Sequence, residues 1–485
     1  MGQAWQGPLE KIDDFRWRIP ESYAKGMRVP GIIYTDEAML KLLRQDQAPQ
    51  QVANVAHLPG VQCCSMAMPD IHWGYGFPIG GVAAVDEQDG AISPGGVGYD
   101  INCGVRLIRT DLTRSDIQDQ IPGLVDRMFQ NIPCGLGSTS KLKLSNKEIR
   151  HVLERGSSWA VQQGFGWSED VKFTEQNGCI EGADASVLSA RALERGRPQL
   201  GTLGSGNHFL EIQEITDIFD DEAARAYGLE KGRITVMIHT GSRGLGYQVC
   251  DDSLDRMVRG MNRYGISIPD KQLACVPVQS PEGRDYFAGM AAAANYAWTN
   301  RQLILHWVRE SFEQVLNASA ESMGMHMVYD VAHNIAKHES HIIKGKEKMV
   351  VVHRKGATRA FGPGHPDIPE KYRSAGQPVL IPGDMGTASY VLAGTETAMK
   401  ETFGSTCHGA GRMMSRHAAV KATKGRAIDR ELADRGITVR SRGRKTLHEE
   451  ASEAYKDIHH VVNIVHNAGI SRKVAKMRPL GVVKG

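Results

Sequence analysis

The sequence predicts an α/β fold in which all 485 residues belong to one domain. Short apolar runs of the strand type alternate with helical patterns, but without the regular spacing of βαβ units. The chain also contains no internal repeat, no low-complexity tract and no Pro/Ser-rich linker at which domains could separate. Length alone would favour two or three domains. We instead expect a single domain over residues 1–485, with mixed sheets at its centre, helices around them, and functional residues on strand ends and glycine loops.

The first half of the chain alternates between strand-like and helical patterns, with Pro and Gly between them. The strand-like runs are GGVAAVD at 80–86 and GVRLIRTDL at 104–112. Helical patterns are expected at 36–44, 113–165 and 183–195. The Gly/Ser segment CGLGSTS at 134–140 interrupts the second of these patterns.

The second half contains the longest helical pattern and most of the glycine turns. Residues 283–322, rich in Ala and aromatic residues, predict one or two long buried helices. STCHGAGRMMSRHAAVKA at 405–422 predicts a glycine turn that opens a helix. The remaining apolar runs predict strands beside glycine turns, at 201–215, 233–246, 325–334, 348–364 and 378–392.

The composition is that of a soluble globular protein, with 41% hydrophobic and 23% charged residues. No apolar run approaches the roughly 20 residues that a membrane-spanning helix needs. The first residues, MGQAWQGPLEKIDDF, lack the apolar core of a signal peptide. The 8 cysteines are scattered without a C-x-x-C pair, so they predict neither a zinc ribbon nor a disulfide framework. We therefore expect a cytoplasmic protein without a membrane partner.

The net charge of +3 is distributed unevenly along the chain. From Arg412 to the end, 17 Lys and Arg stand against 7 Asp and Glu, which leaves a balance of −7 for the rest. A basic portion at 412–485 beside an acidic body suggests a polyanionic partner for that portion. Solvated helix faces would give the same pattern, so charge alone leaves both interpretations open.

The segment SPGGVGYDINCG at 93–104 contains half of a possible metal site. Asp100 and Cys103 lie three residues apart among glycines, which let the backbone turn tightly. A carboxylate and a thiolate at this spacing can face one point. The histidines that would complete such a site lie far away in the sequence, so the fold would have to bring them there.

Four histidines share one sequence context, because each lies at the end of a strand-like run or beside Gly, Ser or Asn: His208, His239, His333 and His408. Strand ends and loops are where rigid scaffolds present ligands. Imidazole suits Zn, Mn, Fe or Cu, thiolate favours Zn, and carboxylate favours Mn or Mg, and a thiolate can also bridge two ions. A single histidine is more often a hydrogen-bonded structural residue, but the context shared by four favours a metal centre.

The other histidines lack this context. His459 and His460 fall in a helical pattern and are expected to be structural, whereas the sequence leaves the roles of His353 and His365 open.

Glycine motifs are the second functional signal. GTLGSGN, GSRGLG, PGDMG and HGAGR could each bring backbone N–H groups to an anion. The last precedes a predicted helix, whose N-terminus would favour a phosphate. The P-loop motif is absent, which excludes a P-loop NTPase. The K-x-[DN]-G motif of the lysine that most nucleotide-adding ligases use is also absent.

Six segments in this order resemble the RNA-splicing ligase RtcB family: GGVGYDINCG, GSGNHFLE, HTGSRGLG, YDVAHN, RKGATRAFGPG and HGAGRMMSR. The similarity extends over nearly the whole chain. It implies a ligase that joins RNA ends bearing a 2′,3′-cyclic phosphate or a 3′-phosphate to ends bearing a 5′-hydroxyl, in tRNA splicing or RNA repair. The family uses GTP and two Mn²⁺ ions, and an archease-type activator is a possible partner.

The resemblance also implies roles for single residues. Cys103 would bridge both metal ions, with Asp100 and His208 completing one site and His239 and His333 the other. His408 would be the nucleophile that forms a covalent histidine–GMP. The GMP pocket would take Asn207, His208, Phe209, Leu210, Glu211, His333, Asn334, Pro382, Gly383, Asp384, Met385, Ser389, His408, Gly409, Ala410, Gly411, Tyr455 and Lys484.

Two positions of this implied pocket need comment. Glu211 would read the guanine base. Some members of the family have Ser where this chain has Asp384, so the contacts of that turn are left open.

The basic portion at 412–485 would hold RNA phosphates, with Arg412 and Arg416 as the first candidates. RSRGRK at 440–445 is equally compatible with a solvated loop. Two other functions use the same residues. A metal-dependent phosphodiesterase or RNA end-processing hydrolase would use the Asp/Cys/His set without GTP. A non-catalytic RNA-binding protein would explain the basic portion but would leave that set without a role.

Overall fold

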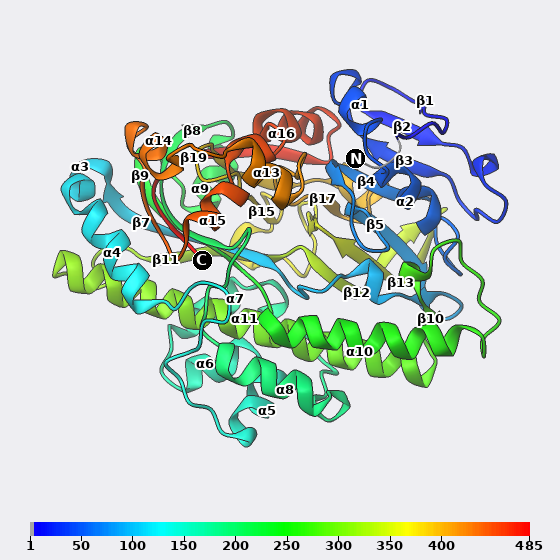
Figure 1. Ribbon diagram of the computed structural model, residues 1–485, viewed down its shortest axis with the longest axis horizontal. Coiled ribbons are helices and arrows are strands. Elements are labelled where there is room, and N and C mark those ends of the chain that lie inside the picture. Colours follow the sequence, from blue (N-terminus) through cyan, green and yellow to red (C-terminus); the bar gives the residue numbers. More distant parts are fainter. Residues whose placement is uncertain (1–3) are drawn as a thin grey trace.

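The computed structural model describes residues 4–485 and contains two large mixed β-sheets (Figure 1). In spatial order, the seven-stranded sheet contains β1 (Glu10–Lys11), β2 (Arg16–Ile19), β3 (Gly31–Tyr34), β4 (Ser65–His72), β5 (Ile79–Asp86), β13 (Lys346–Lys355) and β12 (Asn334–Ile343). The eight-stranded sheet contains β11 (His326–Ala332), β7 (Gly104–Thr113), β9 (Arg233–Thr240), β8 (Phe209–Ile218), β19 (Ser471–Lys484), β16 (Ser389–Gly394) and β15 (Pro378–Ile381), with β18 (Thr438–Ser441) paired to β19.

Two short ribbons complete the strands. They are β6 (Ala91–Ile92) with β10 (Val276–Pro277), and β14 (Ala357–Arg359) with β17 (Ser405–Cys407). The helices are α1 (Glu37–Leu43), α2 (Ala48–Val55), α3 (Arg114–Ile117), α4 (Ile121–Asn131), α5 (Asn146–Arg155), α6 (Ser157–Gln162), α7 (Ser168–Lys172), α8 (Ala190–Gly196), α9 (Asp221–Tyr227), α10 (Arg243–Met261), α11 (Pro281–Leu316), α12 (Glu396–Glu401), α13 (Arg416–Ala422), α14 (Ile428–Asp434), α15 (Arg444–Glu449) and α16 (Ile458–Asn467).

Helices cover both sides of the sheets in Figure 1. α10 and α11 lie together below the sheets, with α5, α6 and α8 packed beneath them, whereas α13 to α16 lie above. The largest buried cluster joins side chains of the seven-stranded sheet, such as Val85 and Ile335, to side chains of the eight-stranded sheet, such as Ile108 and Val236. This arrangement confirms the predicted α/β fold with mixed sheets and flanking helices.

The chain passes directly from one large sheet to the other across a single residue. β11 belongs to the eight-stranded sheet and β12 to the seven-stranded sheet, and only His333 separates them. His333 therefore sits where the chain crosses from one sheet to the other. This junction places the histidine between two hydrogen-bonded frameworks, where its position is well defined.

The long helical pattern at 283–322 forms one helix, α11, of 36 residues. Ser280 caps its start by accepting a hydrogen bond from the Gly283 N–H, and Pro281 occupies the first turn, where its missing N–H costs nothing. Asn317 ends it in the left-handed conformation, with φ of 51°. Most of the Ala and aromatic side chains are buried, which explains why the pattern lacks a polar face.

Three local predictions need correction. The helix expected at 183–195 begins only at Ala190, because Leu188 is extended and Ser189 caps α8. The helix predicted after the HGAGR turn at 408–412 does form, as α13, but it begins only at Arg416, where Ser415 caps it. The GSRGLG segment at 241–246, predicted as a glycine turn after a strand, instead contains the start of α10 at Arg243.

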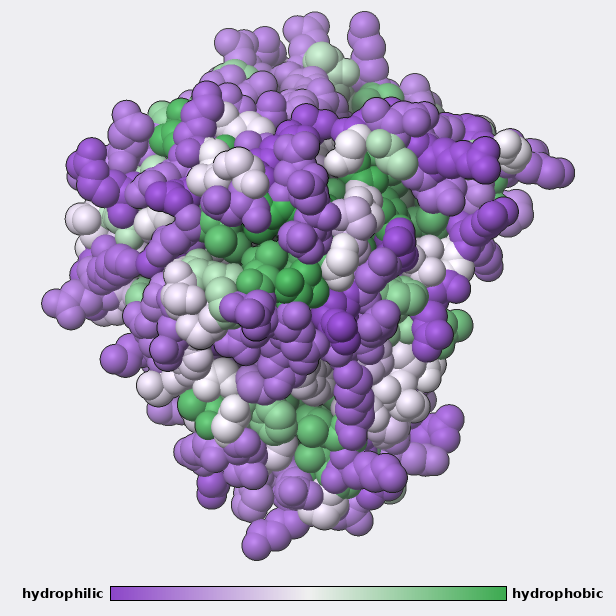
Figure 2. Space-filling model, turned by 90° about the vertical axis from the view of Figure 1, so that its left-hand side faces the viewer, coloured by the Kyte–Doolittle hydropathy of each residue, from purple (hydrophilic) through white to green (hydrophobic). Residues whose placement is uncertain are grey.

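The surface on the left of Figure 1, which carries α3 and α4, is largely hydrophilic, with hydrophobic side chains gathered near its centre (Figure 2). Among residues 4–485, no helix combines the length and the apolar character that crossing a membrane requires. The prediction that MGQAWQGPLEKIDDF is not a signal peptide falls partly on residues 1–3, which lie outside the described residues.

Candidate active site

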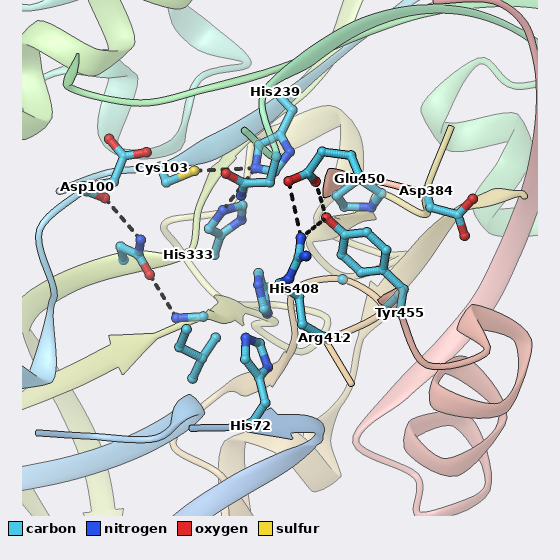
Figure 3. Close-up of a pocket in the computed structure, with 18 of the residues that line it drawn as sticks. His72, Asp100, Cys103, His239, His333, Asp384, His408, Arg412, Glu450 and Tyr455 are labelled. Carbon is cyan, nitrogen blue, oxygen red and sulfur yellow. Dashed lines mark hydrogen bonds and ion pairs between the residues drawn. The ribbon is translucent and has the colours of Figure 1, made fainter. Parts of the chain in front are cut away.

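A cavity of about 330 Å³ opens where the two sheets meet. It collects residues that are far apart in the sequence, including Asp100, Cys103, His239, His333 and His408 (Figure 3). Of the residues that the resemblance assigns to the GMP pocket, most line this cavity, and four do not: His208, Leu210, Glu211 and Ser389. The structure thus brings together the glycine turns and histidines that the sequence singles out.

Strand order explains why four candidate metal ligands converge. β11, β7, β9 and β8 are antiparallel neighbours, so the starts of β7 and β8 and the ends of β9 and β11 lie along one edge of the sheet. Cys103 precedes β7 and His208 precedes β8. His239 lies at the end of β9, and His333 follows β11. The four side chains therefore face one another at this edge.

Two groups of potential metal ligands share the Cys103 sulfur. One group is Asp100, Cys103 and His208, and the other is Cys103, His239 and His333; within each group the ligand atoms lie within 4.8 Å of one another. Cys103 Sγ is 3.5 Å from His208 Nε2 and 3.3 Å from His239 Nε2. His208 Nε2 is 2.8 Å from Asp100 Oδ2, and the Nε2 atoms of His239 and His333 are 3.3 Å apart.

The chemistry of these donors fits divalent cations. His208 Nδ1 lies 3.1 Å from the Leu203 carbonyl oxygen and 3.2 Å from Arg243 Nη1, and these contacts orient the ring so that Nε2 faces the Asp100 carboxylate. Burial lowers the pKa of His208, and it lowers the pKa of His239 and His333 well below the usual range. Neutral imidazoles, a thiol and a carboxylate directed at one another lack the protons to pair fully. A cation between them would satisfy these atoms.

A buried guanidinium fixes the backbone behind this site. Arg301 of α11 donates from Nη1 to the carbonyl oxygens of Asn102 at 2.9 Å and Thr240 at 2.8 Å. Its Nε and Nη2 donate to the two oxygens of Asp330, each at 2.8 Å. Asn102 and Thr240 each adjoin a candidate ligand, and Asp330 lies three residues before another, so one side chain holds three segments in place.

His408 is held by a residue that sequence reasoning missed. Its Nδ1 lies 2.6 Å from Asp70 Oδ2, which also accepts the backbone N–H groups of His408 at 2.9 Å and Gly409 at 3.2 Å. Burial opposes ionisation of Asp70, but the charge and hydrogen bonds of His408 outweigh it and lower the pKa of the carboxyl group. With Nδ1 donating to Asp70, Nε2 is the free nitrogen. Figure 3 shows the His408 ring beside His333, at 4.9 Å between centroids.

The signal for Asp70 was present but weak. It lies in MPDIHWG, where β4 is otherwise buried and apolar, and a carboxylate inside such a run needs a partner. The partner, His408, is 338 residues away in sequence. No periodicity or spacing could have connected the two.

A second group of charged residues lines the other side of the cavity, where Asp384 lies opposite Asp100 in Figure 3. Arg412 Nη1 donates to Glu450 Oε1 at 3.1 Å and to the Tyr455 hydroxyl at 3.0 Å, and its Nη2 donates to the Glu449 carbonyl oxygen at 2.8 Å. Arg412 is thus directed into the protein. Glu450, which no sequence pattern indicated, is the acceptor at its centre.

Arg416 and Lys484 also approach Glu450. The Arg416 side chain is 58% exposed, and its Nε lies 3.8 Å from Glu450 Oε1. Lys484 Nζ lies 3.9 Å from Glu450 Oε2, and burial lowers the pKa of this lysine. Of the two arginines named from the sequence, Arg416 is therefore the one whose charge reaches solvent.

Glu211 and Ser389 lie behind the lining residues. Gln213 Nε2 donates to Glu211 Oε2 at 2.8 Å and to Ser389 Oγ at 3.1 Å. Burial raises the pKa of Glu211 to about 8, and its Oε1 has no hydrogen-bond partner. Leu210, by contrast, is fully buried in the hydrophobic core.

His72 at the end of β4 also lines the cavity, whereas His353, His365, His459 and His460 do not. His459 and His460 are in α16 as expected, where they contact the Tyr390 hydroxyl at 2.6 Å and Asp36 at 2.5 Å. The His353 Nε2 accepts the Ser93 N–H at 3.3 Å, which indicates a structural role.

His365 packs against Phe361, with 4.0 Å between ring centroids and an interplanar angle of 39°. In the RSRGRK segment, Arg440 pairs with Asp126 at 2.5 Å.

Comparisons with known proteins identify the family of this chain. A family model described as tRNA-splicing ligase RtcB matches residues 51–485. The tRNA-splicing ligase RtcB of Archaeoglobus fulgidus is 55% identical over 480 residues, which cover 99% of each chain. Those of Thermococcus kodakarensis and Pyrobaculum aerophilum are 56% identical over 478 residues and 51% identical over 481 residues, again covering 99% of each chain. The chain therefore belongs to the RtcB family of tRNA-splicing ligases.

Proposed function

We propose that this protein is a GTP- and Mn²⁺-dependent RNA ligase that joins 2′,3′-cyclic phosphate or 3′-phosphate ends to 5′-hydroxyl ends, in tRNA splicing or RNA repair. The observation that carries the proposal is the setting of His408. Asp70 orients its ring at 2.6 Å, and the ring lies 4.9 Å from that of His333 in the group of candidate metal ligands. A nucleophile for phosphorus thus adjoins a site suited to cations.

Two Mn²⁺ ions would be held by Asp100, Cys103 and His208 and by Cys103, His239 and His333, with the sulfur common to both. Bound cations would neutralise charge on phosphate oxygens and orient them. The donor set alone also suits zinc, iron or copper, so manganese follows from the family. Arg301 would support a site for any of these metals, because it holds the backbone segments that carry the ligands.

In the proposed reaction, the free Nε2 of His408 attacks the α-phosphorus of GTP, and the bond to pyrophosphate breaks. The RNA 3′-phosphate then displaces His408 from phosphorus and takes the GMP. The 5′-hydroxyl of the second RNA attacks this activated phosphate, and GMP leaves. A 2′,3′-cyclic phosphate must first be opened by water to the 3′-phosphate.

Asp70 would act through His408 at each of these steps. Its carboxylate fixes the proton on Nδ1, which keeps the lone pair of Nε2 directed into the cavity. It also stabilises the ring when that ring becomes positively charged.

The nucleotide would occupy the side of the cavity lined by Asp384, Tyr455 and Lys484. Glu211 would accept hydrogen bonds from guanine, because its Oε1 is buried and unpaired. Asp384 Oδ1 accepts the Gly386 N–H at 2.9 Å, so the Asp384 carboxylate stabilises the turn in which it lies. RNA phosphates would contact Arg416 and, if Arg412 exchanges its internal partners, Arg412 as well.

The labelling experiment tests the proposal directly. The protein is incubated with GTP labelled at the α-phosphate, with and without Mn²⁺, and separated under denaturing conditions. We expect a labelled adduct that needs Mn²⁺, resists base, is lost in acid, and is absent from His408→Ala. His460→Ala is the matched control, because His460 contacts Asp36 away from the cavity and should label normally. A wild-type protein that never labels would contradict the proposal.

A ligation assay separates this function from the alternatives. RNAs with 3′-phosphate and 5′-hydroxyl ends are incubated with Mn²⁺, with and without GTP. A longer product only with GTP supports ligation. Phosphate removal without GTP would support a hydrolase, and RNA binding indifferent to Mn²⁺ and to Cys103→Ala would support a non-catalytic binder.

We also propose that residues 1–485 act as one cytoplasmic catalytic unit, with an archease-type protein as a possible activator. The cavity takes side chains from both large sheets, and its lining residues extend from His72 to Lys484 in the last strand, β19, so most of the chain contributes to one site.

A further inference from the structure

Three tyrosines form a row of ring contacts, one edge-to-face and one stacked, that leads from the cavity to the surface. Tyr75 follows β4 and Tyr99 precedes Asp100, and both line the cavity. Their ring centroids are 5.4 Å apart at an interplanar angle of 66°. Tyr247 of α10 lies parallel to Tyr99, with centroids 4.7 Å apart and an angle of 23°. We refer to Tyr75, Tyr99 and Tyr247 as the tyrosine ladder.

The outer end of the tyrosine ladder faces solvent. Tyr247 is 44% exposed, and the guanidinium of Arg195 in α8 lies 4.9 Å from its ring centroid. Tyrosines that serve the core look different in this protein. Tyr227 and Tyr296 are fully buried, and each donates its hydroxyl to a backbone carbonyl. At this end of the tyrosine ladder, a flat aromatic ring and a planar cation are therefore both open to a stacking partner.

We propose that the tyrosine ladder binds the unpaired nucleotides next to the reacting end of an RNA substrate, with bases stacking on Tyr247 and Arg195. This proposal rests on the proposed RNA ligase function. Aromatic rings beside an arginine are the arrangement that holds single-stranded nucleic acid without sequence preference, because every base has a flat face.

The position of the tyrosine ladder fits an RNA end better than the GTP. Tyr99 is joined to Asp100, and in Figure 3 Asp100 lies across the cavity from Asp384 and Tyr455, where the nucleotide is proposed. A strand stacked on the tyrosine ladder would therefore bring its terminal phosphate or hydroxyl to the candidate metal ligands while the GMP site stays free. The ladder is thus a route into the cavity for the second reactant.

Charge near the tyrosine ladder indicates that stacking, more than phosphate contacts, would hold the strand. Asp251 and Asp252 follow Tyr247 by about one turn of α10. Arg195 contributes a planar cation, and its Nη1 donates to Gln248 at 3.0 Å, which fixes it beside the ring. Because stacking is screened little by salt, its contribution should persist at ionic strengths that weaken phosphate contacts.

The test compares Tyr247→Ala with Tyr247→Phe in ligation assays at varied RNA concentration. We expect Tyr247→Ala to raise the KM for RNA about 5- to 100-fold, by the loss of one base–ring stack, with a smaller effect on kcat. Tyr247→Phe keeps the ring and should lie within about twofold of wild type. Phe219→Ala is the control, since Phe219 is another exposed aromatic side chain, 48% exposed and stacked on Tyr390 outside the cavity.

A fluorescent base locates the RNA end. RNAs carry 2-aminopurine near the 3′-phosphate or near the 5′-hydroxyl, and stacking on the ladder should quench one of them, less so with Tyr247→Ala. The ratio of dissociation constants for Tyr247→Ala and wild type should stay constant between low and moderate salt. An unchanged KM together with no quenching of either RNA would overturn the proposal. Wild-type labelling by GTP is scored separately, so failure of the ligase function is distinguishable from failure of the ladder.

Discussion

Two buried polar clusters on either side of the candidate metal ligands differ in how completely they are paired. Behind the ligands, Arg106 and Arg301 share Asp330, and the nitrogens of both guanidinium groups have acceptors. Around the cavity, buried atoms of Asp70, Glu211, His239 and His333 have no hydrogen-bond partner.

This difference separates scaffold from site. Buried polar groups in folded proteins are nearly always hydrogen-bonded, because an unpaired one costs about 1–3 kcal/mol. A cluster that pairs every atom internally has no capacity left for a ligand, and its role is to hold the backbone. Unpaired atoms gathered around one cavity retain that capacity. The four predictions below test this contrast, beginning with the largest effect.

Replacing Cys103 should have the largest effect, because its sulfur is common to both groups of candidate ligands. We expect Cys103→Ala to weaken Mn²⁺ binding by more than about 100-fold, since the loss of an outer-shell partner alone costs 10- to 100-fold. Ligation should fall accordingly. The measurement is a Mn²⁺ titration followed by the ligation assay.

Cys275→Ala is the matched control for that prediction. Cys275 is a fully buried cysteine that does not line the cavity, so its loss should leave metal binding unchanged. A Cys103→Ala protein that binds Mn²⁺ as tightly as wild type would show that the shared sulfur is not a ligand.

Disrupting the fully paired cluster of Arg106, Arg301 and Asp330 should lower the free energy of unfolding. We expect Arg301→Met to lower the free energy of unfolding by about 3–5 kcal/mol, because it leaves the Asp330 carboxylate buried with only Arg106 as its ionic partner. Urea unfolding followed by circular dichroism measures this. The double variant Arg301→Met/Asp330→Asn should recover part of the loss, and full additivity of the two single losses would argue against a coupled pair.

At the cluster around the cavity, which has unpaired buried atoms, ligand affinity should instead depend on pH. Burial raises the pKa of Glu211 to about 8, so its carboxyl group is mostly protonated at pH 7 and half ionised at pH 8. Guanine offers two N–H donors, which only the ionised carboxylate accepts fully. We therefore expect the affinity for a fluorescent GMP analogue, measured without metal, to rise about fivefold from pH 7 to pH 8.

Glu211→Gln removes the titrating group while keeping its size. Its affinity for the same analogue should be nearly constant over this pH interval. A wild-type affinity that is flat, or that falls as the pH rises, would exclude recognition by the ionised form.

The smallest effect is expected at a paired surface arginine. Arg440 and Asp126 form an ion pair with side chains 42% and 44% exposed. We expect Arg440→Ala to lower the free energy of unfolding by less than about 1 kcal/mol, because exposed pairs are solvated in either state. Its KM for RNA should stay within about twofold of wild type. A tenfold rise in KM would show that RSRGRK is an RNA contact and not a solvated loop.

Sequence patterns predicted those parts of the site that are local. Asp100 and Cys103 share a glycine turn, and each of the four histidines carries its own signal as a strand end or glycine neighbour. The buried helix at 281–316 was predictable because its apolar residues are consecutive in the chain. Asp70, Glu450 and the ladder tyrosines were not, since their partners are remote and their neighbours give at most a weak sign of them.

Helix boundaries show the same limit on a smaller scale. Ser189 and Ser415 determine where α8 and α13 begin, but Ser is common in loops and only the observed cap distinguishes these two. The glycines of HGAGR predict a helix start. In the structure they instead bring the backbone of Gly411 against Asp70. Tertiary packing overrode the local pattern there.

Residue order is enough to establish the chemistry available to this protein, because the kinds of donors, their glycine-rich turns and the six motifs of the RtcB family are properties of the linear chain. Which donors meet depends instead on how the chain folds in three dimensions. Antiparallel strand order puts four ligands on one sheet edge, the crossing at His333 joins the two sheets, and Asp70 reaches His408 across 338 residues. Such encounters depend on packing of the whole chain, which no local spacing encodes.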